Sequence, residues 1–260
     1  MTIRVGRLVA VAILGIGLML TGCAANYTDS TEPRDPFEAA NRDIDALNNH
    51  VDRNILAPVA HAYIDTVPSG MRQGVSNFFD NLGEPNNFLN DLLQGKLGDA
   101  LVDAGRFFIN STIGLAGLFD PASAMGMERN DEDFGQTLGV WGADAGAYLV
   151  LPLLGPSSTR DIFRYPVAIA TDPLTYVDLG WYAVPLKAME VLDTRARIDS
   201  AIRLRDESAV EPYIFTREAY SQRRLDQVYD GNPPDDLFDS LEKSSSNWQL
   251  PTDLMATAAN

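Results

Sequence analysis

Residues 35–55, DPFEAANRDIDALNNHVDRNI, decide the fold class of this chain. Their apolar residues recur at steps of three or four, the period of one α-helical face: Phe37, Ala40, Ile44, Leu47, Val51 and Ile55. Asp35 is suited to the N-cap, Pro36 to the first helical position and Glu38 to the third. The stretch therefore predicts a helix that starts at Asp35, and Pro58 is expected to end or kink it.

The same period returns in short segments that Pro and Gly separate. Ser69 can cap the next helix, Gly83-Glu84-Pro85 is expected to break it, and Gly95 is expected to act as a C-cap further on. Strict alternation of apolar and polar residues, which marks a half-buried strand, is absent throughout. These patterns predict an all-α fold, with a single domain of many short, Pro/Gly-broken amphipathic helices over residues 35–230.

The N-terminus has the three parts of a bacterial lipoprotein signal peptide over residues 1–22. Arg4 and Arg7 precede an uncharged apolar run over residues 8–20, which is too short for a comfortable membrane span. The sequence LTGC then ends at Cys23, which resembles a lipobox and implies cleavage before this residue and its lipidation. Cys23 is the only cysteine, so it cannot form an internal disulfide. An ordinary signal peptide with a chance cysteine is the alternative.

Both flanks of the predicted domain are polar. Residues 23–34 are expected to be a lipidated N-terminus and tether, and residues 231–260 a mostly disordered acidic tail. An aspartate at the second mature position resembles an inner-membrane retention signal, whereas this chain has Ala24 there. We therefore expect attachment to the outer membrane on its periplasmic side.

Charge and composition exclude several classes of function. The 260 residues include 20 basic and 36 acidic side chains, and a net charge of -16 argues against binding to nucleic acid or electrostatic docking on anionic lipid. His50 and His61 are the only histidines, and neither lies in a metalloprotease motif. Neither a nucleophile elbow nor a phosphate-binding loop is present. We therefore expect no metal, no cofactor and no catalytic activity. The rival function is that of a lipid-acting hydrolase whose catalysis depends on His50 or His61.

Two apolar segments in the middle of the chain are too short and too broken to cross a bilayer as helices. Phe107–Met127 has Asp120 as its one charge, and Ala145–Pro156 has none. With a lipid anchor nearby, such segments can lie in the interface of one leaflet. The alternative is that they form a tightly packed soluble core.

Between these segments the sequence predicts a helix with four glycines on one face. Gly135, Gly139, Gly142 and Gly146 follow steps of 4, 3 and 4, with Phe134, Leu138, Trp141 and Tyr148 on another side. Each glycine inside a helix costs about 1 kcal/mol relative to alanine. Such a stripe requires a reason, either close helix packing or a smooth wall for an apolar ligand.

The chain resembles the MlaA (VacJ) family of outer-membrane lipoproteins from Asp35 to about Tyr229. The resemblance rests on the order of several motifs: DPFE at 35–38 with Asn41-Arg42, NFFDNL at 77–82, LQGK at 93–96, RFFINSTIGL at 106–115, EDFGQTLG at 132–139 with Trp141-Gly142, and LPLLGPSS at 151–158 with Arg160-Asp161. It implies a ring-like helical protein in the inner leaflet of the outer membrane. A central amphipathic passage would take misplaced phospholipid from the outer leaflet to a periplasmic carrier protein and so maintain lipid asymmetry. Trimeric porins are implied as neighbours.

The wall of such a passage needs apolar groups for acyl chains and polar groups for a headgroup. Asn77, Asn81 and Asn110, together with Ser111, are the candidate polar partners, and Phe78, Phe79 and Phe108 lie beside them. The candidate glycines are Gly114 and Gly117 and the predicted stripe of Gly135, Gly139, Gly142 and Gly146. Helix capping and core packing are the alternative roles. The rival function is an envelope scaffold or binding lipoprotein that transports nothing.

Overall fold

The first predicted helix is present in the computed structural model, which describes residues 35–234, but Asp35 does not cap it. The helix begins as α2 (Glu38–Val51), continues through a π-helical turn η1 (Asp52–Leu56) and extends as α3 (Ala57–Thr66). The Asp35 carboxylate is buried and accepts a hydrogen bond of 2.7 Å from Nδ2 of Asn41. The N-cap expectation is therefore wrong, because Asp35 is held by a side chain further along the helix. The predicted signal peptide, Cys23 and almost all of the predicted acidic tail lie outside the described residues.

The next helix, α4 (Ser69–Gln94), passes without interruption through Gly83-Glu84-Pro85. The predicted break is wrong because this turn is fixed by tertiary contacts. Glu84 is completely buried and bonded to Arg106 of the neighbouring helix. Gly95, with φ of 80°, ends α4 in the left-handed conformation, as its C-cap pattern predicts.

The remaining elements confirm the predicted helical class. They are α5 (Leu97–Thr112), α6 (Pro121–Ala124), α7 (Phe134–Val140), η2 (Asp161–Phe163), α8 (Arg164–Thr171), η3 (Pro173–Tyr176), η4 (Gly180–Tyr182), α9 (Ala183–Arg197), α10 (Asp199–Ser208) and α11 (Pro212–Val228). One antiparallel hairpin was not predicted, and it pairs β1 (Tyr148–Leu151) with β2 (Gly155–Ser158). Each strand has four residues, which is too short for alternation to be read from the sequence.

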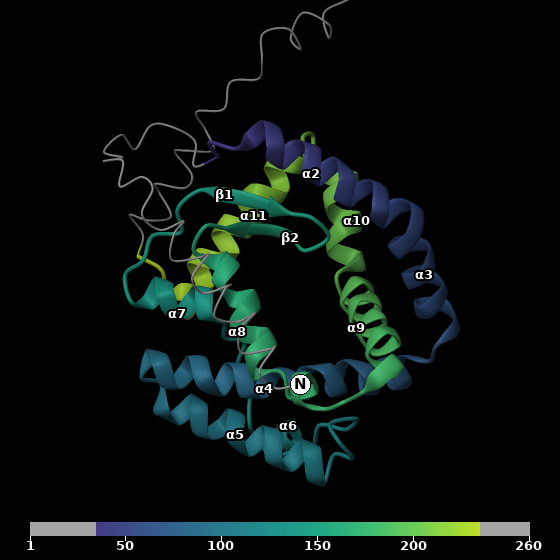
Figure 1. Cartoon of the computed structure of the whole chain (residues 1–260), viewed down its shortest axis with the longest axis vertical. Coiled ribbons are helices and arrows are strands. Elements are labelled where there is room, and N and C mark those ends of the chain that lie inside the picture. The colour runs from purple at the N-terminus through teal and green to yellow at the C-terminus, as the bar shows by residue number, and fades with distance from the viewer. Residues whose placement is uncertain (1–34, 235–260) are drawn as a thin grey trace, which may run out of the picture. The chain divides into compact units, whose positions relative to one another are not determined.

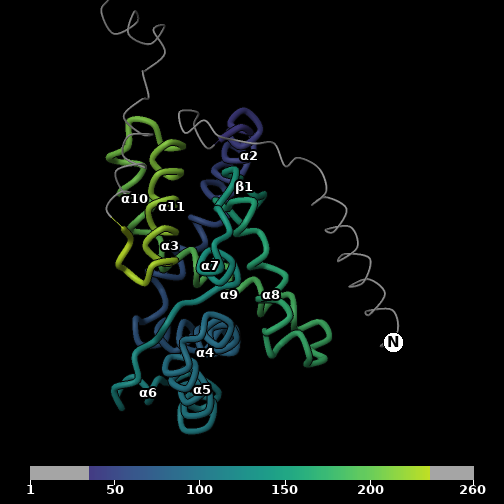
Figure 2. The backbone as a smooth tube through the Cα atoms, turned by 90° about the vertical axis from the view of Figure 1, so that its left-hand side faces the viewer, coloured from purple at the N-terminus to yellow at the C-terminus, as the bar shows by residue number. Residues whose placement is uncertain are grey.

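Contacts between the helices close a circuit, in keeping with the ring-like arrangement that the resemblance implies. α4 packs against α7 and α9, α9 contacts α10, α10 contacts α11, and α11 contacts α7. The arc of α2 and α3 borders this circuit beside α9 and α10, while α5 and α6 lie on the opposite side of α4 (Figure 1). Figure 2 shows α4 and α5 side by side, on the side of the described structure that lies opposite α2.

Burial in the described chain is inverted relative to an ordinary soluble protein. Among residues 35–234, seven hydrophobic residues are buried, against twenty-two polar or charged ones. A small cluster of buried hydrophobic residues consists of Tyr148, Val150 and Tyr213. Large apolar side chains are instead exposed along most of the helices. Among the helices within residues 35–234, none combines the length and hydropathy that a membrane crossing requires.

Candidate lipid-facing site

The α4–α5 pair shows the inversion most clearly. On α5 the apolar residues Leu97, Leu101 and Phe108 are 63%, 73% and 68% exposed. The opposite face, with Asp103 and Arg106, is buried against α4. In water an amphipathic helix turns its apolar stripe inward, so this orientation indicates an apolar surrounding or a partner surface outside.

Arg106 is the centre of the buried polar face. Its Nε donates to Oε1 of Glu84 at 2.8 Å, and its Nη2 donates to Oδ2 of Asp120 at 3.1 Å. The remaining nitrogen, Nη1, donates to the carbonyl of Met127 at 2.6 Å and to the hydroxyl of Ser123 at 3.0 Å. Because every guanidinium nitrogen has an acceptor, this cation is satisfied within the protein and is a structural group rather than a ligand site.

A pair of carboxyl groups lies further along the same interface. Asp103 of α5 is completely buried and faces Asp91 of α4, whose oxygens accept hydrogen bonds of 3.1 and 3.0 Å from Asn130. Burial, followed by the hydrogen bond with Asp91 and the charge of Glu84, raises the pKa of Asp103 to about 9. Both buried oxygens of Asp103 lack another hydrogen-bond partner among the described residues, and the raised pKa favours its protonated form, which can donate to Asp91.

The structure brings the three predicted asparagines to one region, where protein groups satisfy most of their hydrogen-bonding atoms. Asn81 donates to Oγ of Ser111 at 2.9 Å, and Asn77 donates to the carbonyl of Leu118 at 3.3 Å. Asn110 donates to Asp120 at 2.9 Å and accepts from the backbone of Ala122 at 3.1 Å. These amides connect α4, α5 and the loop that follows α5, and only Oδ1 of Asn81 is buried among them without a partner.

The predicted phenylalanines separate into two groups. Phe79 is buried and contacts Phe78 edge to face, with 5.2 Å between ring centroids. Phe108 is mostly exposed and packs against Phe107 instead, at 6.1 Å. Phe108 therefore belongs to the exposed apolar face of α5, apart from the other two rings.

The predicted four-glycine stripe is wrong, because the helix ends too early to contain it. α7 stops at Val140, and Gly142 (φ of 91°) and Gly146 (φ of 69°) adopt left-handed conformations beyond its end. Tyr148, expected on the same helix, lies in β1. Glycine in the left-handed conformation commonly ends a helix. The spacing of 4, 3 and 4 between the four glycines therefore does not mark one face of a helix.

Close packing explains the two glycines that do lie in α7. A Cβ atom on Gly135 would lie 2.6 Å from Oδ1 of Asp161, and one on Gly139 would lie 2.8 Å from a methyl group of Val228 on α11. A Cβ on Gly114 would come within 2.3 Å of the carbonyl of Phe119. These three glycines are packing positions and do not form an open wall.

The three other candidate glycines differ from one another. A Cβ on Gly146 would collide with the hydroxyl oxygen of Thr159, so this glycine is a packing position as well as a left-handed one. Gly117 has φ of 89°, and a Cβ there would lie 2.7 Å from Cβ of Asn81, so it too is a packing position. A Cβ on Gly142 would meet nothing within 4 Å, so its requirement for glycine is conformational alone.

A second buried ionic group joins α7, η2 and α11. Asp161 is completely buried and accepts hydrogen bonds from Arg160, Tyr220 and Arg224 at 2.8, 2.5 and 3.0 Å. Burial alone would raise the pKa of Asp161, but the charge of Arg224 and these hydrogen bonds lower it to about 2. Asp161 therefore stays ionised and joins η2 to α11. Arg224 also donates to Asp133, the N-cap residue of α7, at 2.7 and 2.9 Å, which connects α7 to the same group.

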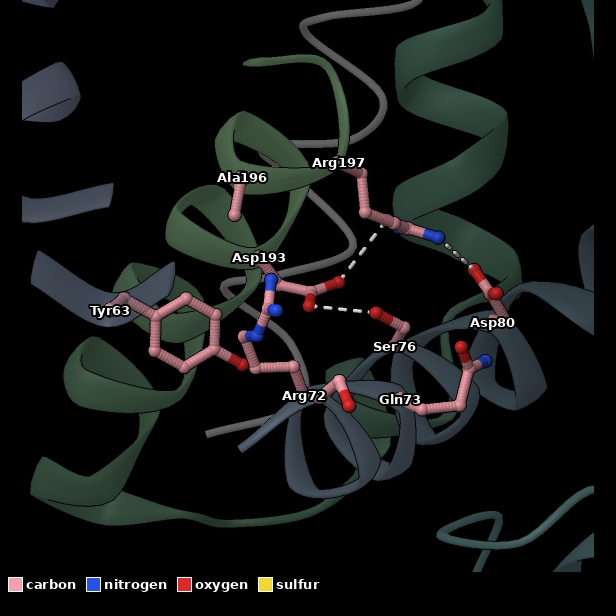
Figure 3. A pocket seen from close by; sticks show the side chains of 9 residues that line it. Tyr63, Arg72, Gln73, Ser76, Asp80, Asp193, Ala196 and Arg197 are labelled. Atoms are coloured by element: carbon pink, nitrogen blue, oxygen red, sulfur yellow. Dashed lines mark hydrogen bonds and ion pairs between the residues drawn. The ribbon is translucent and has the colours of Figure 1, made fainter. Parts of the chain in front are cut away.

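A polar pocket of about 290 Å³ lies where α3, α4 and α9 meet, and no sequence pattern predicted it (Figure 3). Arg72, Ser76 and Asp80 line it from one face of α4, at helical steps of four that the sequence does contain. The facing residues Asp193 and Arg197 come from α9, more than a hundred positions away. No local signal could have joined the two sets. Across residues 35–234, no group of three or more His, Cys, Asp or Glu is arranged to hold a metal ion.

The helical circuit, the buried charges and the exposed apolar faces define a class of helical protein that is polar inside and apolar outside, with no helix suited to crossing a membrane among residues 35–234. A family model described as MlaA lipoprotein matches residues 33–227, and the chain belongs to this family.

Two similar curated proteins are both intermembrane phospholipid transport system lipoproteins MlaA. That of Haemophilus influenzae is 34% identical over 242 residues, covering 86% of this chain and 95% of that protein. That of Escherichia coli is 38% identical over 220 residues, covering 79% of this chain and 82% of that protein. A similar solved structure, concerned with maintenance of bacterial outer membrane lipid asymmetry, has 34% identity and a TM-score of 0.64, covering 76% of this chain and 99% of that one.

Proposed function

We propose that this chain is the outer-membrane lipoprotein of an intermembrane phospholipid transport system and serves to maintain lipid asymmetry. Family membership over residues 33–227 and the transport names of its relatives support this function. The structural observation that carries it is the inverted packing of α4 and α5, with charged groups inside and Leu97, Leu101 and Phe108 outside. This arrangement suits a helical pair whose outer face contacts lipid.

The finer steps of the proposal extend the sequence expectations. Lipidated Cys23 would hold the protein on the periplasmic side of the outer membrane, with the exposed apolar faces in the inner leaflet. Misplaced phospholipid would pass from the outer leaflet through the helical circuit to a periplasmic carrier, beside a trimeric porin. Asn77 and Asn81 remain candidates for the path of the headgroup, and Phe78 remains a candidate for the path of the acyl chains. Direction would come from the downstream transporter, since a passive passage cannot move lipid against a gradient.

Outer-leaflet phospholipid, labelled in cells that lack the protein, tests this function. We expect deletion to raise surface phospholipid, wild type to restore the barrier, and Cys23→Ala to fail at a normal protein level. Unchanged surface phospholipid after deletion would overturn the transport function and leave the scaffold lipoprotein as the better account. Normal complementation by Cys23→Ala would remove the lipid anchor from the proposal.

A further inference from the structure

The pocket between α3, α4 and α9 carries groups of both charges in a small space. Arg72 and Asp80 of α4 and Asp193 and Arg197 of α9 are among its lining residues. The exposed residues Ser69, Gln73 and Arg197 make it reachable from solvent. The pocket is thus polar, accessible and balanced in charge.

Most of these charges are already paired with each other. Arg197 donates from Nη1 to Oδ1 of Asp80 at 2.8 Å, and Asp80 is also 3.1 Å from Nη1 of Arg129. The Arg197–Asp80 pair is drawn in Figure 3. Asp80 is therefore neutralised twice and does not repel an anion in the pocket as a free carboxylate would.

Arg72 is different, because no described acidic side chain pairs with it. Within residues 35–234 every other Lys and Arg except Arg53 lies within 4.0 Å of a carboxylate oxygen. Nε of Arg72 donates to the carbonyl of Val67 at 3.1 Å, which fixes the side chain and leaves its other nitrogens available. Figure 3 shows the guanidinium directed from α4 toward α9, beside Tyr63.

Two further polar atoms in the pocket lack hydrogen-bond partners among the described residues. They are the hydroxyl of Tyr63 and Oδ2 of Asp193, both buried. Asp193 is 1% exposed, and its Oδ1 accepts from Ser76 at 2.8 Å. Its Oδ2 lies 3.2 Å from Nε of Arg197 without the alignment of a hydrogen bond. This oxygen thus has an ion-pair contact but no aligned hydrogen bond, so an aligned donor supplied by a ligand would be stabilising here.

We propose that this pocket binds the phosphate–ammonium headgroup of a zwitterionic phospholipid. The phosphate accepts from the guanidinium of Arg72 and the hydroxyl of Tyr63, and the ammonium donates to Oδ2 of Asp193. Guanidinium groups bind phosphate oxygens in a fork geometry, and a primary ammonium offers three donors to a carboxylate. The lipid source rests on the proposed transport function, whereas the headgroup chemistry rests on the pocket itself.

Calorimetric titration of the purified full-length protein in detergent micelles tests the headgroup chemistry. The probe is dihexanoyl phosphatidylethanolamine below its critical micelle concentration, with dihexanoyl phosphatidylglycerol, phosphoethanolamine and inorganic phosphate as comparisons. Arg72→Gln removes the unpaired cation, and Arg53→Gln is the matched control because Arg53 is also unpaired but exposed and outside the pocket. We expect Arg72→Gln to weaken the ethanolamine lipid about tenfold or more, and Arg53→Gln to leave it unchanged.

Asp193→Asn tests the ammonium end and should reduce the preference for the ethanolamine lipid over the glycerol lipid. If this buried variant does not fold, the comparison of Arg72→Gln with Arg53→Gln still tests whether the pocket binds the headgroup. Equal affinities of Arg72→Gln and Arg53→Gln would overturn the proposal. Binding of inorganic phosphate or phosphoethanolamine as tight as that of the lipid would make this a soluble-phosphate site and overturn the lipid assignment.

Complementation in cells separates this proposal from the transport function. If deletion raises surface phospholipid and Arg72→Gln fails to restore it at a normal protein level, both are supported. If Arg72→Gln restores it fully, transport stands and the headgroup site is overturned. If deletion changes nothing, transport fails, and the titrations alone decide the pocket.

Discussion

Nε of Arg106 on α5 lies 2.8 Å from Oε1 of Glu84 on α4, and the two side chains are only 2% and 0% exposed. A buried ion pair is found here where a soluble helical protein would place leucines. On the opposite face of α5, Leu101 and Phe108 are open to the surroundings. The pair therefore holds together a helical hairpin that is polar inside and apolar outside, which is the arrangement expected of a protein seated in lipid.

Replacing one member of this pair should be severely destabilising. Arg106→Leu leaves Glu84 buried without its cation and removes the donors to Asp120 and Met127. We expect a loss of about 3–5 kcal/mol in the free energy of unfolding. Denaturant unfolding in detergent measures it, with exposed Arg53→Gln as the control for loss of a positive charge. A loss under about 1 kcal/mol would show that the pair contributes little.

The protonated Asp103 predicts a pH dependence of stability. Its folded-state pKa of about 9 exceeds the ordinary value of about 3.9, so the folded chain retains a proton that the unfolded chain releases. This contribution to stability is complete below about pH 4 and is lost progressively as pH rises to about 9.

Asp103→Asn does not titrate and should remove this downward slope. Unfolding free energies at pH 5, 7 and 8.5 provide the measurement, and Asp99→Asn, an exposed change on the same helix, is the control. Parallel pH profiles for wild type and Asp103→Asn would mean that Asp103 is not the group responsible.

Two glycines inside helices should respond to alanine with opposite signs. At Gly83 a Cβ would meet nothing within 4 Å, so Gly83→Ala should stabilise the protein by about 0.5–1 kcal/mol. At Gly135 it would lie 2.6 Å from Asp161 and 2.8 Å from Arg224, both buried, so Gly135→Ala should destabilise. Thermal unfolding of both variants gives the comparison. A neutral Gly135→Ala would mean that this ionic group can rearrange freely.

The exposed apolar face of α5 should determine membrane affinity more than stability. In a Cys23→Ala background, which lacks the proposed anchor, the double change Leu101→Gln and Phe108→Gln should lower vesicle binding at least tenfold, since each buried apolar side chain contributes about 1.5–3 kcal/mol. Flotation with liposomes measures binding. Leu204→Gln, at a 59% exposed position on α10, controls for lost hydrophobicity. Equal binding of all three proteins would place the membrane contact elsewhere.

The sequence by itself determined the features that depend on neighbouring residues. The spacing of three and four residues between apolar positions from Phe37 to Ile55 predicted a helix. Gly95 was correctly expected to end the helix that precedes it. The order of short motifs was sufficient to indicate the family, which the comparison over residues 33–227 confirms. These inferences succeed because helical period and backbone conformation follow from local geometry.

Only the tertiary structure decided which face of each helix is buried. The α5 sequence contains both an apolar stripe through Leu101 and a polar one through Arg106, and its period is the same whichever faces inward. Which face is buried depends on whether the partner helix offers matching charges. Glu84 of α4 offers one to Arg106, although it lies at a turn that was expected to break the helix. The energy of a buried charge depends on distant groups that reach it through the fold, so no stretch of sequence contains that information.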